Sequence, residues 1–336
     1  MQNVFRPQHF VYYLAAAALT ILDGLFFVYD MLRLLPIQVR RRFPPVPLLI
    51  PLVQFPDSDT WTDDDVISVV ESAPYLEGSD RSLVQISQDT VVKPCRIWDY
   101  AISESLAMEL VHKQTRIAVP RMRRLIRHVH SEGEGLIVMD LVPNCRQLRV
   151  AWPSLSFLGK LKVILTMRLY LRQLRCVQHS SSNTPGPAGP KPLDCNGLQF
   201  GWNPRGPFPT ISALEAHFRR EHTSAEYRAS RGGAPPPQCQ PLDQSAFDSL
   251  VFTHNDLNMR NLLLDDDGVL WVVDWGWSGF YPPWFEYLAM KYAAQKDKDP
   301  ESWQEYIKYM AEPDFRVEEW MGSLGYGFAN RPMSNS

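Results

Sequence analysis

The sequence predicts an α+β protein in which short strands precede a long helical region. Residues 83–93 have the pattern of two short strands around a polar turn, and residues 135–142 form an apolar run typical of a buried strand. Residues 154–178 carry apolar side chains at helical spacing, and a second helical region begins near Phe285. The 336 residues, 45% of them hydrophobic, suffice for one large two-lobed domain or two modest domains.

Composition and charge argue against several classes of protein. The formal net charge is −3 and the isoelectric point is about 6.3, so the bulk charge does not indicate nucleic-acid binding. The five cysteines are scattered without a C-x-x-C pair, which disfavours a disulfide framework or a zinc site and favours a reducing compartment. His217 and His222 are predicted to be surface residues of a helix rather than metal ligands.

An apolar segment near the N-terminus, residues 10–29, has the length of a membrane-spanning helix and contains a single charge, at Asp23. Arginines are more frequent after this segment than before it, so an inserted segment would leave the rest of the chain in the cytoplasm. The balance favours a membrane anchor, and the alternative is an apolar helix packed on the main domain. Residues 43–60 are interrupted by prolines and are predicted to be a tether.

Further elements follow from local composition. Residues 103–114 are predicted to be a helix with Ser103 as its N-cap. The stretches 180–209 and 229–242 are rich in Ser, Pro and Gly and are predicted to be loops around a short helix at 212–221.

The strongest motif lies within residues 251–276. His254, Asp256 and Asn261 form the pattern H-x-D-x-x-x-x-N. Two apolar strands follow, joined by a D-D-D-G turn typical of a hairpin, and the second strand ends at Asp274.

This arrangement suits transfer of a phosphoryl group. Such a reaction needs a carboxylate near the acceptor hydroxyl and a metal ion to neutralise phosphate charge. Asp256 can face the acceptor, while the hairpin brings Asp274 back beside Asn261, and both residues offer the oxygen ligands that Mg²⁺ prefers. A lone H-x-D would more often be an ordinary polar turn, but the ordered set favours the catalytic interpretation. His254 is predicted to brace the loop.

These residues resemble the motifs of the aminoglycoside-phosphotransferase and choline-kinase group of protein-kinase-like enzymes, especially its uncharacterised fungal branch. The resemblance covers roughly residues 80–290 and includes four further blocks, which are residues 117–121 (IAVPR), 137–143 (IVMDLVP), 206–208 (GPF) and 279–287 (GFYPPWFEY). It implies a small antiparallel-sheet N-lobe at 55–142 and a larger, mainly helical C-lobe at 143–336, with ATP and Mg²⁺ between them. Residues 1–54 would hold the apolar segment and the tether.

The resemblance places the phosphate-binding lysine at Lys93, at the end of a strand. Such a lysine needs a carboxylate partner. Glu104 is expected to be that partner, because it shares a helix face with the apolar Met108 and Val111 and would be costly to bury alone. Glu109 is the rival partner, but it falls on the other side of the helix.

The resemblance also assigns the connector between the lobes. The backbone of Met139, Asp140 and Val142 would contact the adenine edge.

Two departures from the protein-kinase pattern affect the expected activity. No G-x-G-x-x-G precedes Lys93, and residues 87–89 (SQD) occupy the expected phosphate-loop turn. Asn255 replaces the arginine that in protein kinases contacts a phosphorylated activation loop, and the chain between Asp274 and Tyr287 is too short for such a loop. The second departure favours a small-molecule kinase over a regulated protein kinase, whereas the missing glycine-rich loop favours an inactive kinase-like protein.

The expected function is therefore ATP- and Mg²⁺-dependent transfer of a γ-phosphoryl group to a hydroxyl of a small molecule. The alternative is a kinase-like nucleotide-binding or scaffold protein with little or no activity. The acceptor and the oligomeric state do not follow from the sequence. An aromatic run could line the acceptor pocket, although at least half of it is expected to pack the lobe; it comprises Trp275, Trp277, Phe280, Tyr281 and Trp284.

Overall fold

The computed structural model describes residues 60–76, 79, 82–127, 134–201, 203–231 and 242–328. The predicted anchor at 10–29 and most of the proline-rich tether lie outside these ranges. Within them, no helix combines the length and the apolar character needed to cross a membrane.

The first part of the described chain forms the N-lobe. Its elements are α2 (Asp63–Ser72), β1 (Val84–Gln85), β2 (Thr90–Cys95), α3 (Trp98–Gln114), β3 (Met122–Arg127) and β4 (Gly135–Asp140).

The second part forms the C-lobe, which begins beyond β4. Its longer helices are α5 (Phe157–Leu174), α6 (Ile211–Arg231), α7 (Trp284–Lys296), α8 (Glu301–Met310) and α9 (Phe315–Phe328). Its strands are β5 (Cys145–Gln147), β6 (Val251–Thr253), β7 (Leu262–Asp265), β8 (Leu270–Val272) and β9 (Gly279–Tyr281). Short helical turns are α4 (Leu148–Ala151), η3 (Trp152–Ser154), η4 (Leu198–Phe200) and η5 (Gln244–Phe247).

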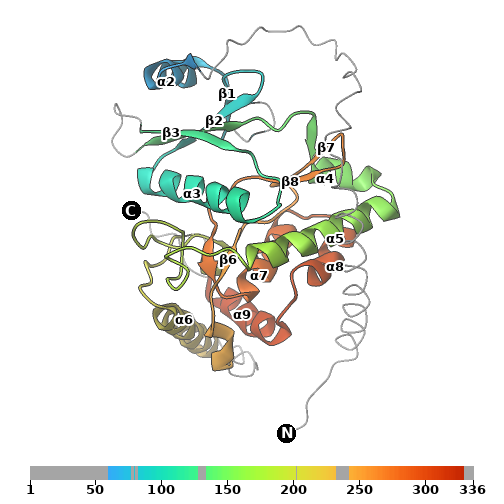
Figure 1. Ribbon diagram of the computed structural model, residues 1–336. Helices are drawn as coiled ribbons and strands as arrows, with labels where there is room; N and C mark the ends of the chain where they lie inside the picture. The colour runs from blue at the N-terminus through green and yellow to red at the C-terminus, as the bar shows by residue number, and fades with distance from the viewer. Residues whose placement is uncertain are drawn as a thin grey trace.

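The N-lobe sheet is antiparallel, with the strand order β1-β2-β4-β3. Successive residues of a strand point to opposite faces of the sheet. Val92 accordingly packs in a cluster with Val66 of α2, whereas Val91 belongs to the larger core that includes Met108 of α3. The sheet therefore has α2 on one face and α3 on the other (Figure 1).

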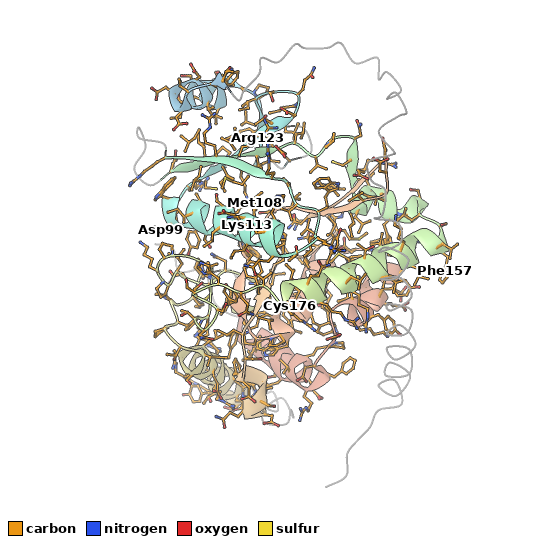
Figure 2. The ribbon with its side chains drawn as sticks, viewed as in Figure 1. Asp99, Met108, Lys113, Arg123, Phe157 and Cys176 are labelled. Carbon is orange, nitrogen blue, oxygen red and sulfur yellow. The ribbon has the colours of Figure 1, made fainter. Side chains whose placement is uncertain are left out.

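Aromatic side chains fill the C-lobe core. The ring of Phe200 lies 5.4 Å from that of Phe218 and 5.6 Å from that of Phe285, measured between centroids. Trp152 and Trp303 meet edge to face at 5.3 Å. Phe157, at the start of α5, points away from this core and is 70% exposed (Figure 2).

A hairpin of β7 and β8 lies between the N-lobe sheet and the C-lobe helices (Figure 1). Its turn closes at Gly268, whose positive φ of 74° suits a glycine. β5 pairs with the other edge of β7, so the hairpin is attached to the segment that follows β4. The hairpin thereby holds the residues on either side of it, Asn261 and Asp274, where the two lobes meet.

The predicted fold class is confirmed, because a small antiparallel sheet precedes a mainly helical region. The boundary at 142/143 remains a prediction. The predicted cap at Ser103 was wrong, since α3 begins five residues earlier and Ser103 is buried within it. Ile97 caps this helix without a side-chain hydrogen bond, so its start carries no capping signal in the sequence.

The prediction that His217 lies on the surface was also wrong. α6 runs on to Arg231, and its buried face includes His217, whose ring lies 5.3 Å from that of Phe208. His222 is half-buried and stacks on Trp320 of α9 at 4.8 Å. Both rings pack between α6 and its neighbours.

Candidate active site

The loop between β6 and β7 is braced by His254. This residue is fully buried, and its Nε2 lies 3.0 Å from the carbonyl oxygen of Val273. Its Nδ1 accepts a hydrogen bond of 3.3 Å from the backbone N–H of Asp256. A single neutral tautomer satisfies both contacts, and burial lowers the pKa of His254 to about 4. The imidazole thus holds the loop in a fixed position, as predicted from the sequence.

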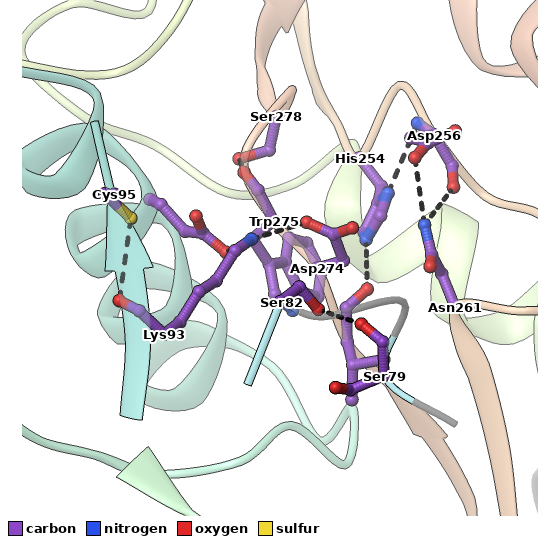
Figure 3. A network of polar contacts seen from close by, with 12 residues as sticks. Ser79, Ser82, Lys93, Cys95, His254, Asp256, Asn261, Asp274, Trp275 and Ser278 are labelled. Atoms are coloured by element: carbon purple, nitrogen blue, oxygen red, sulfur yellow. Dashed lines mark hydrogen bonds and ion pairs between the residues drawn. The ribbon is translucent and has the colours of Figure 1, made fainter. Parts of the chain in front are cut away.

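The Asp256 carboxylate is held by two amides. Asn258 Nδ2 donates to Oδ1 at 3.0 Å. Asn261 Nδ2 donates to Oδ2, also at 3.0 Å (Figure 3). Burial and the nearby Asp274 carboxylate raise the pKa of Asp256 to about 7, against the opposing effects of Arg260 and the two amides. A carboxylate with this pKa is suited to accept a proton near neutral pH. Asn258 was missed in the sequence, because one more polar residue in a loop has no distinctive spacing.

Glu286 also holds this loop in place, and its role was not predicted from the sequence. Its carboxylate accepts the backbone N–H of His254 at 2.6 Å and that of Asn255 at 3.1 Å. The side chain is only 3% exposed, and burial raises its pKa to about 7. The signal available in the sequence was an acid among apolar residues at the start of α7.

Asn255 is held from another side. Its backbone is in the left-handed region, with φ of 64°, and its Nδ2 donates to the carbonyl of Asn196 at 2.7 Å. Gly197 makes this approach possible, because a Cβ there would lie 2.6 Å from that Nδ2. Asn255 therefore has a structural role in this loop.

Asp274 follows β8 in a left-handed backbone conformation, with φ of 65°. Residues other than glycine rarely adopt this backbone conformation. Such backbone strain is concentrated at functional sites. The preceding residue, Val273, donates its N–H to the carbonyl of Asn261 at 3.0 Å, which places Asp274 beside the catalytic loop. Its carboxylate is 49% exposed and is therefore open to a ligand.

Lys93 joins the two lobes. Its Nζ lies 2.7 Å from Glu104 Oε1 and 2.7 Å from Asp274 Oδ1. Burial alone would lower the pKa of Lys93, but the two carboxylates hold it above its ordinary value. One ammonium serves two carboxylates. The pKa of the more buried Glu104 is raised by burial, whereas Lys93 outweighs burial at Asp274 and lowers its pKa.

The predicted pairing of Lys93 with Glu104 is therefore present. The Glu104 side chain is 6% exposed, on the same helix face as the buried Met108 and Val111. The rival, Glu109, pairs instead with Lys113 on the exposed side of α3. The second contact of Lys93, with Asp274 in the C-lobe, was not predicted.

Asn261 and Asp274 fit a Mg²⁺ ion. Asn261 uses its Nδ2 for Asp256, which leaves its Oδ1 available as a neutral oxygen ligand. In the described part of the chain, no three His, Cys, Asp or Glu residues are grouped closely enough to hold a metal. A site with two protein oxygens suits Mg²⁺, which commonly takes its other ligands from water and substrate phosphates.

The connector has one backbone group that a nucleotide could use. Met139 and Val142 are buried, while the Asp140 carboxylate is engaged by Arg123 Nε at 2.5 Å. Among the described residues, the N–H of Val142 has no hydrogen-bond partner. The arrangement agrees with adenine contact through the backbone of Met139, Asp140 and Val142, which remains a proposal.

The expected position of the phosphate-loop turn was wrong. The S-Q-D turn lies at the connector, because the carbonyl of Asp89 accepts the N–H of Leu141 at 2.8 Å. The turn at the opposite end of β1 is closed by a bridge between Tyr75 and Val84, and it contains Ser79 and Ser82 (Figure 3). The difference arises because a strand-like bridge at Tyr75 precedes β1 and carries no clear pattern in the sequence.

A small pocket opens beside Asp256. Its volume is about 240 Å³, and it is lined by Leu198, Asp256, Arg260, Trp277, Ala293, Lys296 and Asp297. Of the predicted aromatic run, Trp277 lines this pocket, whereas the other four members are buried in the core.

One family model matches part of this chain. Residues 197–319 match the family model described as "Phosphotransferase enzyme family". A search of curated proteins found no significant match to the chain.

Solved structures that are similar to this chain include three phosphotransferases. An aminoglycoside-3'-phosphotransferase of type VIII shares 14% identity, with a TM-score of 0.45 and coverage of 79% of this chain and 98% of that one. The macrolide 2'-phosphotransferase MphH from Brachybacterium faecium shares 15% identity, with a TM-score of 0.44 and coverage of 80% and 92%. The GDP complex of aminoglycoside 2'-phosphotransferase-IIIa shares 13% identity, with a TM-score of 0.45 and coverage of 73% and 78%.

The family match contains Asp256, Asn261 and Asp274, which are the residues on which the resemblance was first seen. The predicted resemblance to a family of phosphotransferases is confirmed over residues 197–319.

Proposed function

We propose that this protein transfers the γ-phosphoryl group of ATP to a hydroxyl group of a small molecule and requires Mg²⁺. The observation that carries this proposal is the contact of 2.7 Å between Lys93 and Asp274, which lie 181 residues apart in the chain. It joins the lysine assigned to phosphate binding in the N-lobe to the carboxylate assigned to metal binding in the C-lobe. The family match over residues 197–319 supports the same reaction class.

Asp256 has the environment of a catalytic carboxylate. The amides of Asn258 and Asn261 fix its orientation toward the pocket, and a raised pKa near 7 lets it accept a proton. The acceptor oxygen forms a bond to the γ-phosphorus while the bond to the β–γ bridging oxygen breaks, and ADP leaves with that electron pair. The hydroxyl proton passes to Asp256, so the products are a phosphate ester, ADP and a proton.

The other residues prepare the phosphate side of the site. Bound Mg²⁺ would neutralise charge on the phosphate oxygens, and Asn261 and Asp274 would hold it. Lys93, oriented by Glu104, would contact the phosphates, and the connector would hold the adenine. The catalytic domain would lie in the cytoplasm, with residues 10–29 as its membrane anchor.

The alternative is a kinase-like binding or scaffold protein. The observation that favours it is the absence of a G-x-G-x-x-G sequence ahead of Lys93. The two functions differ in turnover, because a scaffold would bind nucleotide without producing ADP.

The test is ADP formation by the full-length protein with Mg-ATP, first with water as the acceptor and then with a panel of small hydroxyl compounds. Asp256→Asn should lower turnover by roughly 10²–10⁴-fold and leave ATP affinity nearly unchanged. Asp267→Asn is the matched control, because Asp267 is exposed in the hairpin turn and should leave turnover unchanged. Equal turnover by wild type and Asp256→Asn would exclude Asp256 as the catalytic carboxylate. Nucleotide binding without turnover would favour the scaffold.

A further inference from the structure

The pocket beside Asp256 differs in size and charge from a site for a large polycation. Its volume of about 240 Å³ is below the roughly 300–1,000 Å³ typical of sites for drug-sized ligands. Its charged lining consists of two cations, Arg260 and Lys296, and two acids, Asp256 and Asp297. The size indicates a small acceptor, and the charge pattern determines which kind.

Both acids of the pocket already have hydrogen-bond partners in the protein. The Asp297 side chain is largely buried and accepts a hydrogen bond of 2.9 Å from Arg260 Nε. Both carboxylate oxygens of Asp256 already accept amide hydrogen bonds from Asn258 and Asn261. A cationic group placed beside Arg260 would be repelled by its guanidinium group and would have to share the one carboxylate with which Arg260 pairs, Asp297.

Arg260, by contrast, has N–H donors that remain available to a ligand. Its guanidinium group bonds to Asp297 through Nε alone, and within the described residues its two terminal nitrogens have no acceptor. These nitrogens form a planar fork that matches the two oxygens of a carboxylate or phosphate. The ion pair with Asp297 fixes the direction of the fork, so little conformational entropy is lost when an anion binds.

Arg260 and Asp256 line one pocket from the same loop. An acceptor whose hydroxyl lies at Asp256 therefore has its other end within reach of Arg260, and the half-buried Trp277 offers an apolar wall beside both.

We propose that the acceptor is a small hydroxyl compound that carries a carboxylate or phosphate group, and that Arg260 selects it through this anionic group. This inference rests on the proposed phosphotransferase function. The transfer step is unchanged, since the acceptor hydroxyl gains the phosphoryl group and loses its proton to Asp256 while ADP departs.

Four probes with the same three-carbon hydroxyl skeleton test the inference on the full-length protein. Glycerate carries a carboxylate, glycerol 3-phosphate a phosphate, glycerol no charge and 2-amino-1,3-propanediol a positive charge. The melting temperature and the rate of ADP formation are measured with each probe in the presence of Mg-ATP. At least one anionic probe should have about tenfold higher apparent affinity than glycerol, and the cationic probe should have the lowest. Comparison of glycerate with glycerol 3-phosphate identifies which anion is preferred.

The double variant Arg260→Gln/Asp297→Asn isolates the role of the fork. Removing both members of the ion pair leaves no unpaired buried charge, so this variant should fold even if Arg260→Gln alone does not. It should bind the anionic probe and glycerol equally. Arg260→Lys should recover part of the preference, because it restores charge without the planar fork.

The outcomes separate this inference from the proposed function. Absence of any melting shift with ATP and Mg²⁺ alone would contradict nucleotide binding, and with it the proposed function. With that shift present, three results would overturn the anionic acceptor. They are preference for glycerol or the cationic probe, absence of any preference among the probes, and anion preference that survives in the double variant.

Discussion

The catalytic loop and the Lys93 cluster organise polar groups in opposite ways. In the loop from His254 to Asn261, neutral groups nearby in the chain donate the hydrogen bonds that hold Asp256. The buried Glu286 fixes the backbone of this loop. In the cluster, one ammonium group binds two carboxylates that come from distant parts of the chain.

This difference indicates which region is rigid and which can rearrange. The loop is largely buried, and His254, Asp256 and Asn261 are hydrogen-bonded within the protein without ligand, so its geometry should not depend on nucleotide. The cluster contains the half-exposed Asp274, whose contact with Lys93 can be exchanged for contacts with metal and phosphate. Changes in the loop should therefore affect turnover, and changes in the cluster should affect nucleotide binding and stability.

The largest effect on stability is expected for Lys93→Met. This substitution leaves Glu104 buried without a counter-ion, which should cost about 3–5 kcal/mol in the free energy of unfolding and weaken ATP binding. Burial already raises the pKa of Glu104, and loss of Lys93 should raise it further. A raised carboxyl pKa gives stability that is lost as the pH rises, so the destabilisation should be greater near pH 8 than near pH 5.

Urea unfolding of wild type and Lys93→Met at both pH values measures this effect. A difference in stability that does not depend on pH would contradict the assignment of Glu104 as the buried partner.

A smaller effect is expected for Glu286→Gln. The amide can accept one of the two backbone hydrogen bonds from His254 and Asn255 but would direct N–H groups at the other, which should cost about 1–3 kcal/mol. Because this carboxylate positions the loop, the rate of turnover should fall while ATP affinity stays near the wild-type value. Glu305→Gln, at an exposed site on α8, is the control. Loss of ATP affinity in Glu286→Gln with normal turnover would contradict the claim that the loop governs turnover and the cluster governs nucleotide binding.

The smallest effect is expected for Glu104→Gln. Lys93 keeps Asp274 as a partner, so ATP affinity should fall less than in Lys93→Met. The double variant Lys93→Met/Glu104→Gln should lose no more ATP affinity than Lys93→Met, because the two residues act as one unit. Glu109→Gln, on the exposed side of α3, should change stability by less than about 0.5 kcal/mol. Additive losses in the double variant would show that Lys93 and Glu104 act independently.

The same contrast explains how much could be predicted from the sequence. The site motif was recognisable because Asp256, Asn261 and Asp274 lie within a short segment, where a hairpin determines their arrangement. The partnership of Glu104 was predictable because an acid on an apolar helix face needs a cation.

The features that were missed depend on tertiary contacts. Glu286 accepts backbone N–H groups of the catalytic loop, and Gly197 leaves room for the Asn255 side chain. Only the fold brings about these contacts. The S-Q-D turn was misplaced because the bridge at Tyr75 adds a strand-like segment before β1. His217 was assigned to the surface because α6 was predicted eleven residues too short, which hid its packing face.

The central claim is that Asn261 and Asp274 form the metal site of a Mg-ATP-dependent enzyme. The most direct measurement is ATP affinity of the full-length protein with and without Mg²⁺, in wild type and in Asp274→Asn. Asparagine is chosen because it tolerates the positive φ at this position. The wild type should bind ATP more tightly with Mg²⁺, and Asp274→Asn should lose most of that difference. Equal ATP affinity with and without Mg²⁺ in the wild type would contradict the account.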